Sequence, residues 1–254
     1  MPGPSSPSAP APVPPTPVPP PPPTSTPTPT PLTVAELRGK IIFKSDRDGG
    51  PFNYYVMNAD GSNIQRLEKA AAEAFANPLQ AREGLSPDGF QIVLGERRCG
   101  YSIDIYTCAL YILDTKLHAD LIYSDREPSQ GIWFVQNNVK AKAPVWSPRG
   151  DYIAFVSNHE TPVGCRKTAN LFKGTPTQKP VIRRLTEFCA GADTDHPSFS
   201  PDGSQIVFWS EFPTKNREIF VVGVGADDSF DHRNTTPRLL TPDEYNDWDP
   251  LWIK

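Results

Sequence analysis

A four-residue turn of the form Ser-Pro-(Asp or Arg)-Gly occurs three times in this chain, each time before an apolar run typical of a β-strand. The three copies are residues 86–89, 147–150 and 200–203. Proline at the second position presets φ near −65°, and glycine at the fourth takes a conformation that other residues avoid. A repeat of this kind restricts the chain to architectures that stack one supersecondary unit several times.

Each repeat predicts four short strands. A large apolar residue lies directly before the serine of each turn, at Leu85, Trp146 and Phe199, and a β-branched or aromatic run follows the turn. Third and fourth strands are expected at 54–57 and 65–67, 109–113 and 120–123, 170–172 and 182–186, and 219–222 and 238–241. Four strands in about 50 residues are typical of a propeller blade.

The two ends of the chain supply complementary parts of one blade. Residues 40–45 match a second strand with no first strand before it, and residues 249–253 match a first strand with nothing after it. Pairing the two would close the ring and remove exposed sheet edges. The predicted fold class is therefore all-β: a four-bladed β-propeller of four-stranded blades, closed by the C-terminal strand and preceded by a disordered Pro-rich tail. An open fragment of a larger propeller is the alternative.

Two segments resemble the blades of the TolB-type β-propeller family. Residues 54–62 read Tyr-Tyr-Val-Met-Asn-Ala-Asp-Gly-Ser and are followed by Arg66-Leu67, and residues 195–203 read Asp-His-Pro-Ser-Phe-Ser-Pro-Asp-Gly. The resemblance covers residues 39–254 and is specific to the type of blade rather than to a function. Because propellers of this type also accompany peptidase-type hydrolase domains, the resemblance implies an accessory or gating role beside a hydrolase as one possible function.

The N-terminal part differs in composition from the rest. Sixteen of the 31 prolines fall in residues 1–31, and no charged residue precedes Glu36. Such a segment cannot bury a core, so residues 1–38 are predicted to be a disordered, extended spacer before a propeller at 39–254. A docking strand for a proline-binding module is the alternative. Because no signal peptide or long apolar stretch is visible, we expect a longer native chain with a signal peptide, lipobox or membrane anchor before this end.

The four cysteines fall into two pairs. Cys99 and Cys108 flank the turn between the second and third strands of one repeat, and Cys165 and Cys189 lie before the third and after the fourth strand of the next. In an antiparallel sheet the start of one strand lies opposite the end of its neighbour, so each pair is predicted to form a disulfide. Four free thiols are the alternative. Disulfides and a spacer together favour an extracytoplasmic location: periplasm, cell surface or secreted, as in a bacterial envelope protein.

Catalytic patterns are weak in this chain. No Gly-x-Ser-x-Gly elbow occurs, and the one helix-like stretch, 68–76, is too short for a hydrolase layer. His196 with Asp195 and Ser198 invites a catalytic triad, but this histidine occupies a repeat slot that Ala143 fills elsewhere. The chain is therefore predicted not to be an enzyme and to need no cofactor, with Ca²⁺ as the one candidate ion.

Four carboxylates are the candidate ligands for that ion. Asp193, Asp195, Asp247 and Asp249 precede the innermost strands, whose entrances ring one mouth of the expected channel. Carboxylates there suit Ca²⁺ or a cationic ligand. The alternative is a structural role in which they accept hydrogen bonds from loop N–H groups.

The longest insertion, residues 125–141, carries the candidate partner contacts. Trp133 and Phe134 lie there with Gln136 and Asn137, and aromatic rings beside amides are typical of a contact to protein or sugar. Folding back onto their own blade is the alternative. A net charge of −4 argues against nucleic acid. The predicted function is a non-catalytic extracytoplasmic binding or scaffold module that engages another protein through its loop faces, with a carbohydrate-binding propeller as an alternative.

Overall fold

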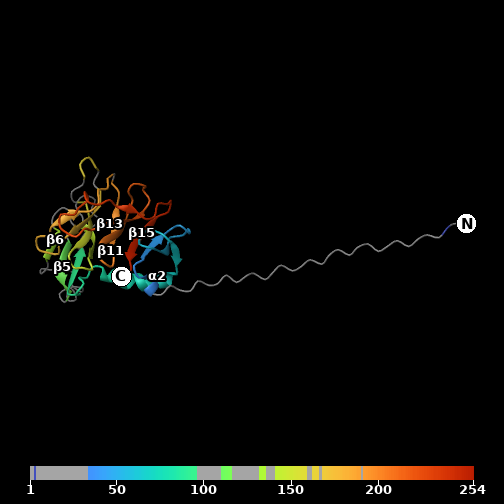
Figure 1. The fold of residues 1–254 in the computed structure, drawn as a ribbon, viewed down its shortest axis with the longest axis horizontal. Helices are drawn as coiled ribbons and strands as arrows, with labels where there is room; N and C mark the ends of the chain where they lie inside the picture. Colours follow the sequence, from blue (N-terminus) through green and yellow to red (C-terminus); the bar gives the residue numbers. More distant parts are fainter. Residues whose placement is uncertain are drawn as a thin grey trace. The chain divides into compact units, whose positions relative to one another are not determined.

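The computed structural model describes Gly3 and residues 34–95, 110–115, 132–135, 141–158, 162–165, 168–189 and 191–254. The chain divides into two units, residues 1–30 and residues 31–254. The second unit is built mainly of antiparallel β-sheet, with the helices α1 (Val34–Leu37) and α2 (Lys69–Arg82) (Figure 1). Leu37, inside the segment predicted to be spacer, is fully buried in the core of this unit.

The described strands form four antiparallel sheets, numbered here by their order along the chain. The first sheet has the order β15 (Asp247–Trp252), β1 (Ile41–Ser45), β2 (Asn53–Met57), β3 (Gln65–Leu67). The second contains β4 (Gln91–Gly95), β5 (Leu110–Asp114) and β6 (Ile132–Val135). The third runs β7 (Ala141–Trp146), β8 (Ile153–Ser157), β9 (Asn170–Gly174), β10 (Ile182–Arg184), and the fourth runs β11 (Thr194–Phe199), β12 (Gln205–Ser210), β13 (Glu218–Gly223), β14 (Arg238–Leu239). This is a β-propeller-like fold.

The C-terminal strand belongs to the first sheet, as the two chain ends predict. In the antiparallel pair of β15 and β1, Trp252 lies opposite Ile41 and Asp247 lies opposite Ser45. Trp252 and Ile253 are buried, so this strand contributes core as well as hydrogen bonds. The outermost and innermost strands of the first sheet are thus about 180 residues apart in sequence.

The three repeated turns have the same geometry. In each, the glycine N–H donates to the carbonyl of the serine at 2.9 Å, and the glycine takes a positive φ of 74°, 76° or 70°. In the turns at Ser86 and Ser200 the serine hydroxyl donates to the aspartate two residues later, at 2.5 and 2.6 Å. Where Arg149 replaces that aspartate, the Ser147 hydroxyl donates instead to Asp151 at 2.7 Å. The conserved geometry therefore tolerates a change in which residue supplies the carboxylate.

Two elements differ from the sequence expectation. Helix α2 extends six residues beyond the predicted stretch and contains Pro78. Proline has no backbone N–H, so the helix lacks one hydrogen-bond donor at this position. Strand β6 lies where a long loop was expected, and it pairs with β5 as the outer strand of the second sheet. The prediction of a loop around Trp133 and Phe134 is wrong for this reason. The fourth strand predicted at 120–123 lies outside the described residues.

Apolar side chains fill the spaces between neighbouring sheets. One cluster joins the third and fourth sheets, through residues such as Val156, Leu171 and Phe208. Another joins the fourth and first sheets through Phe43, Val207 and others. Apolar residues on the sheet faces therefore pack against the neighbouring sheet. This packing holds the ends of adjacent strands close to one another.

Candidate functional site: a pocket beneath α2 and an acidic junction

The innermost strands of three sheets carry the same backbone irregularity. Ala143, His196 and Asp249 have φ values of 49°, 50° and 50°, and each directly precedes a proline. The pairing register shifts at each of these points, as expected for a β-bulge. A left-handed conformation costs an ordinary residue about 1–2 kcal/mol, and strain of this kind gathers at binding sites.

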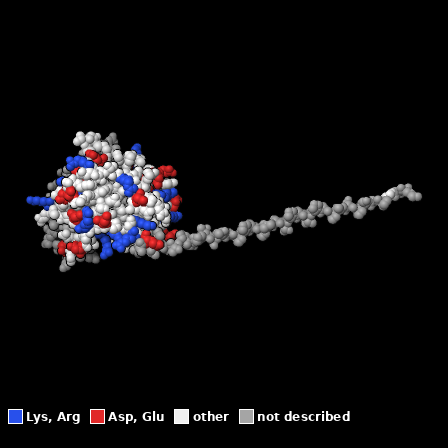
Figure 2. Space-filling view, viewed as in Figure 1, with Lys and Arg blue, Asp and Glu red and all other residues white. Residues whose placement is uncertain are grey.

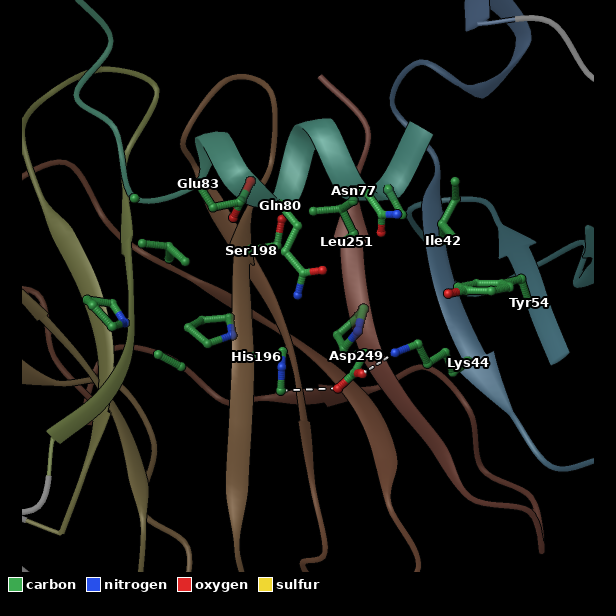
Figure 3. Close-up of a pocket in the computed structure, with 17 residues that line it drawn as sticks. Ile42, Lys44, Tyr54, Asn77, Gln80, Glu83, His196, Ser198, Asp249 and Leu251 are labelled. Atoms are coloured by element: carbon green, nitrogen blue, oxygen red, sulfur yellow. Dashed lines mark hydrogen bonds and ion pairs between the residues drawn. The ribbon is translucent and has the colours of Figure 1, made fainter. Parts of the chain in front are cut away.

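These three bulges line one pocket (Figure 3), with a volume of about 260 Å³. Helix α2 covers one side, and its Asn77 and Gln80 side chains point into the pocket. Neither amide makes a side-chain hydrogen bond to another described residue, so both are available to a ligand. Lys44 and Tyr54 of the first sheet also line the pocket, on the side of Asp249 (Figure 3).

Charged groups of both signs cross the floor of the pocket. Lys44 Nζ lies 2.7 Å from Asp249 Oδ2, and His196 Nδ1 lies 3.1 Å from Asp249 Oδ1 (Figure 3). Beside the pocket, but not in its lining, Lys142 Nζ lies 2.9 Å from both Asp195 and Asp193. Burial alone would lower the pKa of Lys142, but Asp195 and Asp193 outweigh it and raise this pKa, so the lysine stays charged.

The four predicted metal ligands do not form one group. Asp193 and Asp195 pair with Lys142, Asp249 pairs with Lys44, and Asp247 is bound by Arg47. Within the described part of the chain, the acidic group that converges is Glu218, Asp243 and Asp247. The sequence analysis identified only Asp247 of these three residues.

This second group, called here the acidic junction, lies where β13 of the fourth sheet meets β15 of the first. One oxygen of each carboxylate of Glu218, Asp243 and Asp247 lies within 4.8 Å of the others. Glu218 is completely buried, and its Oε2 accepts a hydrogen bond from Thr241 Oγ1 at 3.0 Å. Its other oxygen, Oε1, has no hydrogen-bond partner among the described residues. Burial raises the pKa of Glu218 to about 7.

One guanidinium group lies beside the acidic junction. Arg47 donates to both oxygens of Asp247, at 3.0 and 2.9 Å, and to Asp243 at 3.3 Å. Its guanidinium also stacks over the ring of Tyr55, with 4.9 Å between the guanidinium carbon and the ring centroid. Burial raises the pKa of Asp247 even with this partner. Arg47 therefore serves two of the three carboxylates and leaves Glu218 without a cation.

The possible catalytic triad is not assembled. The Ser198 hydroxyl accepts the backbone N–H of Trp252 at 3.0 Å and is 1% exposed. His196 faces Asp249 and the indole N–H of Trp209 rather than this serine.

One of the two predicted disulfides is confirmed. Cys165 and Cys189 are bonded, with their Cα atoms 5.2 Å apart. The bond joins the loop before β9 to the segment after β10, within the third sheet. Cys99 and Cys108 lie outside the described residues.

The predicted partner contacts stay a prediction. Trp133 and Phe134 belong to strand β6. Gln136 and Asn137 lie outside the described residues. The pocket beneath α2 and the acidic junction are therefore the sites that the described side chains define.

The surface charge is mixed on the face seen in Figure 2. Lysine and arginine side chains lie between aspartate and glutamate side chains, with no large area of one sign. The described side chains on this face form no basic area of the kind that a nucleic-acid interface needs. In the described part of the chain, no helix has both the length and the apolar character needed to span a membrane.

No protein-family model and no curated protein matches the chain. Among solved structures, it is similar to TolB from Acinetobacter baumannii, with 14% identity, a TM-score of 0.43, and coverage of 85% of this chain and 43% of that one. It is also similar to a putative TolB from Agrobacterium tumefaciens (15%, TM-score 0.42, 80% and 61%) and to an oligogalacturonate lyase in complex with manganese (17%, TM-score 0.36, 79% and 73%). The chain thus spans less than two thirds of the length of either TolB structure.

Proposed function

We propose that this chain is a non-catalytic, extracytoplasmic binding module that holds a short polar segment of another protein in the pocket beneath α2. The observation that carries the proposal is the convergence of three equivalent bulges on one pocket whose free amides come from a helix outside the repeat. A fold by itself leaves function open, so the proposal rests on this site.

The chemistry of the pocket suits a polypeptide. Asn77 and Gln80 each offer a donor and an acceptor, which matches the alternating N–H and C=O groups of a peptide backbone. Lys44 and Asp249 present one charge of each sign. A volume of about 260 Å³ is below the range of typical drug-sized ligand sites, so it fits one or two residues at a loop tip or chain end.

The proposal includes a closed four-bladed ring as the platform for this pocket. The innermost strands β15, β11 and β7 lie against each other in this order, and β7 also lies against β4 of the second sheet. Lys254, after β15, forms an ion pair with Glu83, which precedes the second sheet. The Trp146 N–H donates to the Glu83 carbonyl at 2.6 Å, and the Trp252 N–H donates to Ser198. These contacts support a ring in which all four sheets meet around the pocket.

An extracytoplasmic location is supported by the Cys165–Cys189 bond. Disulfides persist in oxidising compartments and are rare where glutathione and thioredoxin keep thiols reduced. Non-reducing peptide mapping of protein from its native source tests this part of the proposal, and two alkylatable thiols at these positions would contradict it.

A peptide-display experiment tests the binding site. Phage-displayed peptides selected on the purified protein are expected to bind Gln80→Trp at least about tenfold more weakly, because the indole fills the pocket. The matched control is Ala74→Trp, on an exposed position of α2 that does not line the pocket, and it should bind like the wild type. Binding that is insensitive to Gln80→Trp would contradict the proposal, as would stoichiometric labelling of a serine by a fluorophosphonate probe.

A further inference from the structure

We propose that the acidic junction binds a hard divalent cation through Glu218, Asp243 and Asp247. The site is separate from the pocket beneath α2. It lies between the fourth and first sheets, at the start of β13 and the start of β15.

The first argument is the unpartnered oxygen of Glu218. This side chain is completely buried, its Oε2 is used by Thr241, and its Oε1 has no partner in the described structure. A buried charged group without a partner is costly, so such groups are paired or coordinate metals. A cation near Oε1 supplies the missing partner.

The second argument comes from the equivalent place between the third and fourth sheets. There the first residue of β9 is Asn170, which corresponds to Glu218 as the first residue of β13. Thr186 corresponds to Thr241, because the Thr186 hydroxyl donates to Asn170 just as the Thr241 hydroxyl donates to Glu218. The Asn170 amide oxygen accepts from Thr186 Oγ1 at 2.9 Å and from the Phe188 N–H at 2.7 Å. In this slot a neutral amide therefore finds protein partners for both its oxygen and its nitrogen.

The facing strand has changed in the same direction. The first residue of β11, opposite Ser210, is Thr194, whose hydroxyl donates to Ser210 at 3.1 Å. The first residue of β15, opposite Ser45, is Asp247. Two slots that are neutral at one junction are thus both carboxylates at the other, and the loop residue Asp243 adds a third. One guanidinium, that of Arg47, thus faces three carboxyl groups and bonds only two of them.

The ligand atoms indicate the class of ion. All three are carboxylate oxygens, with the Thr241 hydroxyl beside them, and no sulfur or imidazole nitrogen belongs to the group. Oxygen-only sites suit Ca²⁺, Mg²⁺ or Mn²⁺. Asp243 is 29% exposed at its side chain, so the group is open to solvent on that side and water can complete the coordination. Arg47 holds Asp243 and Asp247 in place through its hydrogen bonds to both side chains.

Calorimetric titration of the whole chain with CaCl₂, MgCl₂ and MnCl₂, after EDTA treatment and desalting, tests the proposal. We expect saturable binding of at least one of these ions, with a matching rise in Tm. Glu218→Gln places in this slot the kind of amide that Asn170 provides at the other junction, and it should weaken binding at least about tenfold. Asp243→Asn, on a part-exposed loop residue, should do the same with little effect on folding.

The matched control is Asp193→Asn, which removes a carboxylate that pairs with Lys142 outside the acidic junction. It should leave the affinity unchanged. The proposal is overturned if none of the three ions binds, because the buried carboxyl is then neutralised by a proton. It is also overturned if Glu218→Gln and Asp243→Asn bind as tightly as the wild type, since the ion would then lie elsewhere.

Discussion

The junction between the third and fourth sheets and the junction between the fourth and first sheets occupy equivalent places in the repeat, but they satisfy their polar groups differently. At the first, both polar side-chain atoms of Asn170 have hydrogen-bond partners inside the protein. At the second, Glu218 retains an oxygen without a described partner beside two more carboxylates. The repeat therefore places equivalent strand ends next to each other at both junctions. The residue at each of these positions decides whether the buried polar atoms find hydrogen-bond partners within the protein.

The two junctions also differ in what holds their loops. The segment that bonds Asn170 includes Phe188 and continues into Cys189, which is tied to Cys165. The acidic junction is held by ion pairs of Arg47, and one of its strands, β15, is the end of the chain. Covalent and local contacts support the neutral junction, whereas long-range contacts support the acidic one.

The largest expected effect comes from removing most of β15, the strand that begins at Asp247 of the acidic junction. Deleting residues 249–254 removes the buried Leu251, Trp252 and Ile253. Truncating a single buried aromatic residue costs about 3–5 kcal/mol. The deletion is therefore expected to leave the chain unfolded at room temperature, without a cooperative melting transition. Circular dichroism during heating measures this. A truncated chain that melts like the full one would show that the first sheet does not need its C-terminal strand.

The next effect concerns the covalent support of the neutral junction. Replacing both Cys165 and Cys189 by serine is expected to lower the free energy of unfolding by about 3 kcal/mol, because the bridge closes a loop of moderate length in the unfolded chain. Urea unfolding of the double variant and of reduced wild type measures the change. If neither is destabilised, hydrogen bonds alone support this junction.

Exchanging the chemistry of the two junctions gives an intermediate effect. Asn170→Asp is expected to destabilise the protein by about 1–3 kcal/mol at neutral pH, because it buries a charge and removes the amide donor that faces the Phe188 carbonyl. The control is Asn53→Asp, the same substitution at the first residue of β2, where the side chain accepts a hydrogen bond from Arg66 at the protein surface. Equal stability of Asn170→Asp and the wild type would contradict the view that this slot requires a neutral group.

The reverse exchange, Glu218→Gln at the acidic junction, is expected to alter the pH dependence of stability in cation-free buffer. Burial raises the pKa of Glu218 to about 7, so the folded state keeps a proton that the unfolded state releases at lower pH. Wild-type stability should therefore fall as pH rises from about 5 to about 8, and Glu218→Gln should remove part of this fall. Thermal unfolding with EDTA across this range tests it. Parallel pH profiles for the two proteins would contradict the assignment.

The smallest effect involves the turns that stack at the neutral junction. Gly203 lies close to Arg149 and Ser147 of the preceding turn. Hydrogen bonds from Ser200 and Ser204 lower the pKa of Asp202 to about 2, so its contribution to stability is present above about pH 4 and is lost as pH falls toward 2. Asp202→Asn should reduce this acid loss by less than about 1 kcal/mol, because the turn is exposed. Acid titration followed by fluorescence measures it, with Asp151→Asn as the corresponding change in the Arg149 turn.

The sequence predicts the features that depend on local pattern. The turns, most strands, the pairing of the two chain ends and the Cys165–Cys189 bond follow from turn residues, alternation and strand order. Strand β6 was missed because its short apolar run lies in a long insertion whose composition is equally typical of a loop. Propensity alone does not decide such a segment, since pairing with β5 supplies the hydrogen bonds.

The candidate sites are less accessible to sequence reasoning. Glu218, Asp243 and Asp247 meet only because β13 and β15 belong to neighbouring sheets, so spacing along the chain does not bring them together. A signal was present: Glu218 stands where the third repeat has Asn170, and aligning the strand starts would have marked it. The contribution of α2 to the pocket had no repeat counterpart from which to predict it.

The bulges at Ala143, His196 and Asp249 have a consequence for how such a scaffold can change its ligand. At each, a fixed backbone irregularity and the following proline set the direction in which one side chain leaves the strand. Asp and His are among the residues that tolerate this conformation best, so each bulge can carry one of several small polar side chains. If the pocket binds a peptide as proposed, exchanging one of these three residues changes the polar group offered to that peptide and leaves the sheets unchanged.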